Sequence, residues 1–132
     1  MTDVLQLESC RPPWLDAICA RVNELLARPD DWDGRGGHAP SAATAHDAVT
    51  VVGLVQCGMC PLPHLAMDPD GKVELSWSGS GIRVEIEVDG SGVADVFQRV
   101  PGFVDIERRV PLVGGDFRFV AAAITKLDPV SA

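Results

Sequence analysis

The sequence predicts one α+β domain over residues 1–132, with two N-terminal helices and one C-terminal helix packed on an antiparallel meander sheet of four or five strands. The length suits one domain and is too short for two independent cores. Apolar residues repeat at helical spacing early in the chain, alternate with polar residues in its middle, and return to helical spacing near its end. Turn sequences rich in Gly, Asp and Ser separate the alternating segments, which favours hairpins.

Two helices are expected before the sheet. In the first, over residues 14–27, the apolar residues share one face, and Pro29 stops it. The second follows Ser41, a natural N-cap, and should end between Cys57 and Pro61 because Gly58 and the prolines that follow cannot continue a helix. The apolar face of the second helix consists of Ala45, Ala48, Val49, Val52 and Val55.

The sheet is expected to begin with a short strand, Leu65–Met67, which the Asp68–Gly71 turn joins to a second strand. The third strand alternates most clearly, and Val93–Phe97 and then Val104–Val110 are the candidates for the next two. One face of this sheet should lie on the helices and the other should face water. The predicted inward residues of the second and third strands are Val73, Leu75, Trp77, Ile82, Val84, Ile86 and Val88, and Arg83, Glu85 and Glu87 point outward, where water should keep these carboxylates ordinary.

A last helix is predicted after the sheet, with Asp116 as its N-cap. Its apolar residues at helical spacing are Phe117, Val120, Ala121, Ile124 and Leu127.

The formal net charge of −8 disfavours binding to nucleic acid and to anionic membranes, because the summed field repels phosphate. It is compatible with docking on a basic partner and equally with simple solubility. The N-terminal sequence lacks the basic start and apolar run of a signal peptide, and no apolar stretch reaches the roughly 20 residues that a membrane span needs. We therefore expect a cytoplasmic protein whose four cysteines are reduced: Cys10, Cys19, Cys57 and Cys60.

The loop Trp32–Ser41, the Ala-rich helix after it and the segment Asp68–Trp77 resemble a group of small bacterial proteins with a Trp-Asp-Gly-x-Gly-Ala loop and a Gly-x-apolar-x-apolar-x-Trp strand. The likeness covers roughly residues 31–90, and Gly37 stands where that group usually has Ala. The resemblance implies a bacterial or phage source and a similar fold. It implies no activity, because none is assigned to the group.

Two segments could carry function. The Cys57-Gly58-Met59-Cys60 sequence with His64, and His46 on the preceding helix, has the donor types of a zinc site. The same cysteines could instead belong to the apolar core. Redox chemistry is less suited to a pair at a helix C-terminus, where the dipole disfavours the thiolate.

The Asp30–Pro40 loop can be explained structurally, with Trp32 as an anchor and Asp33 bonding nearby amides. It could also be a recognition loop that presents Trp32, Asp33, Arg35 and His38 to a partner. A calcium loop is disfavoured because its fifth and twelfth positions, counted from Asp31, hold Arg35 and Ala42.

No nucleophile elbow, phosphate loop or other catalytic set is present in the sequence. The leading hypothesis is therefore a non-enzymatic, protein-binding accessory module of the inhibitor, immunity or scaffold type. Its partner would be another protein or a second copy, with the Leu65–Met67 strand as an open edge. The alternative is a small zinc protein that uses Cys57, Cys60 and His64.

Overall fold

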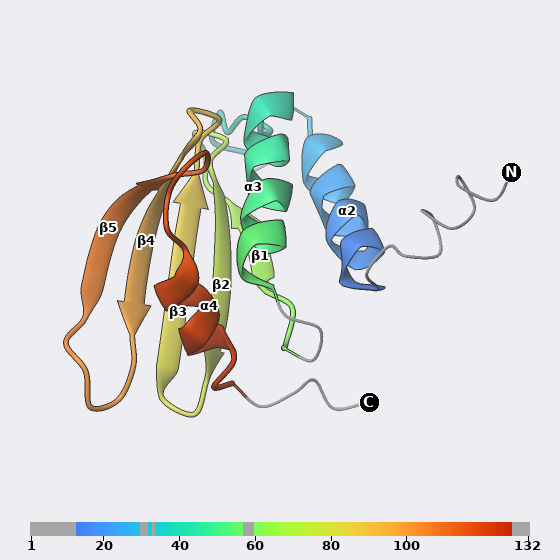
Figure 1. The fold of residues 1–132 in the computed structure, drawn as a ribbon. Coiled ribbons are helices and arrows are strands. Elements are labelled where there is room, and N and C mark those ends of the chain that lie inside the picture. The colour runs from blue at the N-terminus through green and yellow to red at the C-terminus, as the bar shows by residue number, and fades with distance from the viewer. Residues whose placement is uncertain (1–12, 30–31, 33, 57–59, 128–132) are drawn as a thin grey trace, which may run out of the picture.

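The computed structural model describes residues 13–29, 32, 34–56 and 60–127, in which helices lie along one side of a five-stranded antiparallel sheet (Figure 1). This α+β arrangement, with two helices before the sheet and one after it, confirms the predicted fold class. The elements in chain order are α2 (Pro13–Leu26), α3 (Ala42–Val55), β1 (His64–Met67), β2 (Val73–Gly79), β3 (Ile82–Val88), β4 (Val93–Arg99), β5 (Ile106–Pro111) and α4 (Arg118–Ile124).

The sheet is a meander in which each strand pairs with its neighbours in the sequence, in the order β1-β2-β3-β4-β5. Its register follows from the alternation of apolar residues, since Leu75 lies opposite Ile86 and Ile86 lies opposite Val96. All three side chains are buried on the helix side. The fifth strand begins at Ile106, two residues later than predicted, and it runs through Pro111, which an edge strand tolerates.

Helices α3 and α4 cover the inner face of the sheet, and α2 packs on α3 and beside β1 (Figure 1). Ser41 caps α3 as predicted, because its hydroxyl accepts a hydrogen bond from the Thr44 amide at 3.1 Å. The helix ends at Val55, just before the predicted region. The largest fully buried side chains between the two layers include Trp77, Leu25, Leu65, Leu75, Ile86 and Ile124.

The last helix begins later than the sequence predicts. Phe117, and not Asp116, occupies the N-cap position, and α4 ends at Ile124. The Asp116 carboxylate still bonds the Arg118 amide at 2.9 Å. It also holds the Arg118 guanidinium, and these hydrogen bonds lower the pKa of Asp116 to about 2. The buried side chains of Phe117 and Leu127, on either side of the helix, anchor this short segment to the core.

A hydrogen bond from the β3–β4 turn to Asp47 connects α3 to the sheet. The Asp47 side chain is only 8% exposed, and its Oδ2 accepts a hydrogen bond from the Gly92 amide at 3.0 Å. Gly90, in the same β3–β4 turn, has a φ of +88° and lies so close to α3 that an added Cβ would be 3.0 Å from the Thr44 hydroxyl. The turn is therefore held against the first turns of α3 by a polar contact that the sequence did not suggest.

Candidate functional site

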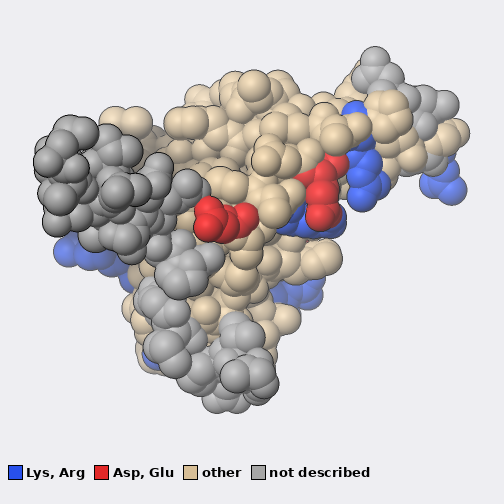
Figure 2. All heavy atoms as spheres, turned by 90° about the vertical axis from the view of Figure 1, so that its right-hand side faces the viewer, with Lys and Arg blue, Asp and Glu red and all other residues tan. Residues whose placement is uncertain are grey.

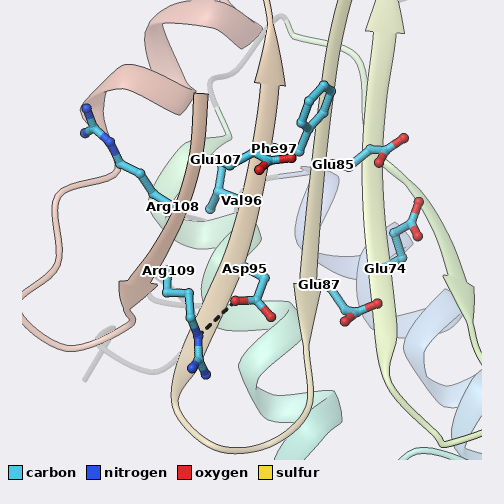
Figure 3. Close-up of a pocket in the computed structure, with 9 residues that line it drawn as sticks. All are labelled: Glu74, Glu85, Glu87, Asp95, Val96, Phe97, Glu107, Arg108 and Arg109. Atoms are coloured by element: carbon cyan, nitrogen blue, oxygen red, sulfur yellow. Dashed lines mark ion pairs between the residues drawn. The ribbon is translucent and has the colours of Figure 1, made fainter. Parts of the chain in front are cut away.

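The sheet face opposite the helices is covered by no other element among the described residues. A hollow of about 430 Å³ lies on it, lined by side chains from β2, β3, β4 and β5 (Figure 3). We call this surface the acidic sheet face, defined by Glu74, Glu85, Glu87, Asp95 and Glu107. The outward orientation of Glu85 and Glu87 was predicted. Alternation along the strands also places Glu74, Asp95 and Glu107 outward, and the register of the hairpins decides which of these side chains are neighbours.

Three carboxylates of the acidic sheet face lie side by side across neighbouring strands. Glu74 on β2 is paired with Glu87 on β3, and Glu87 is paired with Asp95 on β4. Like charges directly opposite each other in a sheet are destabilising. At the end of the row, the Arg109 Nε lies 3.0 Å from the Asp95 Oδ1 (Figure 3). The row thus concentrates negative charge, which Arg109 at the Asp95 end and Lys72 beside Glu87 offset only in part.

Glu87, in the middle of this row, is not an ordinary surface carboxylate. Partial desolvation raises its pKa, and the neighbouring carboxylates of Asp68, Asp95 and Glu74 act in the same direction. The Lys72 ammonium, with its Nζ 3.8 Å from the Glu87 Oε1, opposes the shift. The expectation that water keeps this carboxylate ordinary was therefore wrong for Glu87. Partial burial is the main cause of its raised pKa, and the carboxylates that add to the shift come from other strands and turns.

Glu87→Gln is expected to stabilise the protein slightly at pH 7. A carboxylate whose folded pKa is raised binds protons more tightly in the folded state, so its contribution to stability falls as pH rises from the unfolded to the folded pKa. Gln removes this loss, and the gain should stay below about 1 kcal/mol because the side chain is partly solvated. Thermal melts of both proteins between pH 3 and pH 8 measure it. The difference should vanish below the ordinary pKa of Glu, and a constant difference at every pH would contradict the explanation.

An aromatic ring lies among the carboxylates. Phe97 on β4 is flanked across the strands by Glu85 on one side and Glu107 on the other. Its ring is half-buried, and the Arg99 guanidinium lies 5.4 Å from the ring centroid. Arg108, which also borders the hollow, points away from the carboxylates (Figure 3). Its guanidinium lies over the Phe119 ring, 4.9 Å from the ring centroid. The acidic sheet face therefore combines carboxylates with one apolar platform.

The predicted recognition loop is anchored to the body of the protein. The Trp32 indole donates a hydrogen bond to the His38 carbonyl at 3.1 Å, and the His38 amide donates one to the Pro69 carbonyl at 2.9 Å. An added Cβ at Gly71 would lie 2.9 Å from the Ala39 carbonyl, so loop and turn are in close contact. These bonds support the structural interpretation of Trp32.

Arg35 and His38 remain exposed, whereas Asp33 lies outside the described residues. Partner binding by this loop stays a prediction.

The residues of the zinc hypothesis are not brought together among the described residues. Cys60 is buried in the core, whereas His64 is exposed on β1 and His46 is exposed on α3. Within residues 13–29, 32, 34–56 and 60–127, no three His, Cys, Asp or Glu side chains form a metal cluster.

Cys60 is disulfide-bonded, contrary to the expected reduced state, and a disulfide sulfur is not the thiolate that zinc binds. Cys57 lies outside the described residues, so the hypothesis stays a prediction that requires Cys60 to be reduced.

The predicted open edge at Leu65–Met67 is partly covered. Strand β1 is an edge strand, but the Arg21 guanidinium of α2 donates a hydrogen bond to the Leu65 carbonyl at 3.1 Å. A side chain that already bonds an edge carbonyl hinders the approach of an added strand at that residue. The opposite edge, β5, carries the charged side chains of Glu107, Arg108 and Arg109, which also discourage strand addition.

Surface charge is unevenly distributed. Figure 2 shows the α2 side of the molecule, where uncharged surface predominates and few carboxylates are visible outside the grey residues. The cross-strand row of carboxylates is found on the acidic sheet face.

Comparison of the chain with known protein families, with curated proteins and with solved structures finds no match. The likeness to the Trp-Asp-Gly-x-Gly-Ala group therefore stays a prediction. None of the described helices combines the length and the apolar character needed to cross a membrane.

Proposed function

We propose that this protein is a non-enzymatic docking module that binds the basic surface of another protein through its acidic sheet face. The observation that carries the proposal is the row formed by Glu74, Glu87 and Asp95. Opposed carboxylates cost stability, and a sequence that keeps such a local conflict on an uncovered face usually gains function from it. An inhibitor, immunity or scaffold role is compatible with docking of this kind.

The composition of the face favours a partner rich in Lys and Arg. Carboxylates attract such side chains over long range and speed their encounter. At contact, the Phe97 ring offers a surface for the aliphatic stem or the guanidinium of an approaching Arg. A second copy of this chain is a poorer occupant, because two acidic faces repel each other.

The decisive experiment uses a substitution that should not harm the fold. Glu74→Lys replaces a repulsive pair with an attractive one opposite Glu87, so the thermal stability of the variant should equal or exceed that of the wild type. The same change reverses charge on the acidic sheet face. We expect it to weaken partner binding by about tenfold or more, because like charges at an interface are strongly unfavourable.

Binding is measured by capture from the lysate of the native host, followed by titration of the captured protein at low and at high salt. Asp70→Lys is the matched control, since it makes the same charge change at the exposed β1–β2 turn and should leave affinity within about twofold. Higher salt should weaken the wild-type complex. Equal losses in both variants, a partner with an acidic surface, or capture of this chain alone would each contradict the proposal.

A further inference from the structure

A second hollow, of about 200 Å³, lies on the helix side of the sheet between α4, the end of β4 and the loop that leads to β5. Its walls are mainly apolar and include two aromatic rings. The lining residues include Gln98, Val100, Phe103, Val104, Ile106 and Phe119. This site shares no lining residue with the hollow on the acidic sheet face.

Gln98 is the unusual member of this lining. It lies on the inner face of β4, opposite Val84 and Ile106, and is only 6% exposed. Its Oε1 is buried and has no hydrogen-bond partner. Buried side-chain amides nearly always have partners, because an unpaired acceptor loses its bonds to water without replacement. Here the unpaired oxygen belongs to a side chain that borders an open space.

The mouth of the hollow is apolar as well. Phe103 is 68% exposed and Val104 is 88% exposed, which is unusual for large apolar side chains so close together. The Lys126 ammonium lies 5.0 Å from the centroid of the Phe103 ring, and the Arg108 guanidinium lies 4.9 Å from that of Phe119. Each ring thus has a cation beside it, and both rings line the hollow.

We propose that this hollow binds a compact aromatic molecule that carries one hydroxyl or N–H donor, of the phenol or indole class. An apolar cavity of about 150 Å³ accommodates benzene, so this volume suits one ring or two fused rings. The rings of Phe103 and Phe119 offer edge or face contacts to an aromatic guest. The terminal torsion of Gln is soft, so the Gln98 amide can turn its oxygen toward the guest's donor.

The test compares indole with benzothiophene, which has the same shape and lacks the N–H group. Titration of the full-length protein by calorimetry should show indole binding about tenfold more tightly than benzothiophene, since one hydrogen bond to a buried acceptor decides between them. Amide shifts observed by NMR should cluster around Phe103 and Phe119.

Gln98→Met keeps the unbranched shape and removes the acceptor. Its melting temperature should equal or exceed that of the wild type, and its two affinities should become equal. Glu74→Lys is the control, because it alters the acidic sheet face alone and should leave indole binding unchanged. The inference is overturned if neither compound binds, if benzothiophene binds as tightly as indole to the wild type, or if Gln98→Met keeps the preference.

Discussion

Replacing Gly115 with alanine should destabilise the protein by about 3 kcal/mol or more, a large part of the stability of a typical domain. A Cβ at this position would lie 2.0 Å from the Pro111 carbonyl oxygen and 2.6 Å from the Val110 Cγ1. Both neighbours belong to the end of β5, and the carbonyl is backbone that cannot rotate away. Relief of the clash must therefore shift either the strand or the segment that leads into α4.

Urea denaturation of the wild type and the variant measures this loss. Gly53→Ala is the matched control, because Gly53 is an exposed helical residue of α3 whose added Cβ would approach nothing closer than the Trp14 ring at 4.0 Å. That variant should gain about 0.5–1 kcal/mol from the higher helix propensity of alanine. If Gly115→Ala were as stable as the wild type, the close packing of this segment on β5 would be wrong.

Asp47→Ala is expected to cost about 2–3 kcal/mol. The substitution leaves the part-buried Gly92 amide without its acceptor and removes a hydrogen bond to a charged group. Because this bond joins residues 45 positions apart, its loss loosens the contact between α3 and the β3–β4 turn. Urea denaturation gives the loss of stability, and amide hydrogen exchange should show faster exchange at Gly92.

Asp47→Asn separates the hydrogen bond from the charge. Its amide oxygen can still accept from Gly92, so it should retain at least half of the stability that Ala loses. Equal losses in the Ala and Asn variants would mean that the negative charge, and not the bond to Gly92, is what α3 requires.

Most of the fold could be predicted because local patterns agree with it. The alternation of Ile82–Val88 specifies a half-buried strand, and Ser41 specifies where α3 begins. Local patterns do not describe contacts between distant segments. Gly114 and Gly115 look alike in the sequence, yet Gly114 has a φ of +79° with open space around it, whereas Gly115 is required because β5 leaves no room for a side chain.

The acidic sheet face could be predicted only in part. Alternation identified Glu85 and Glu87 as outward, but the neighbours of Glu87 depend on the register of two hairpins. No spacing along the chain places Glu74 beside it. The same limit explains Gln98, whose unpaired oxygen is evident only once Ile106 and Phe119 are seen around it.

The meander order also bears on how the molecule assembles. Every strand pairs with a neighbour joined to it by a short connection, so each hairpin closes at a small entropic cost and contacts within the sheet are local in sequence. Contacts such as that between Asp47 and Gly92 span much longer loops. We therefore expect the hairpins to form early in folding and α2 and α3 to dock later. The surface that carries the carboxylate row would then take shape before the hydrophobic core is complete.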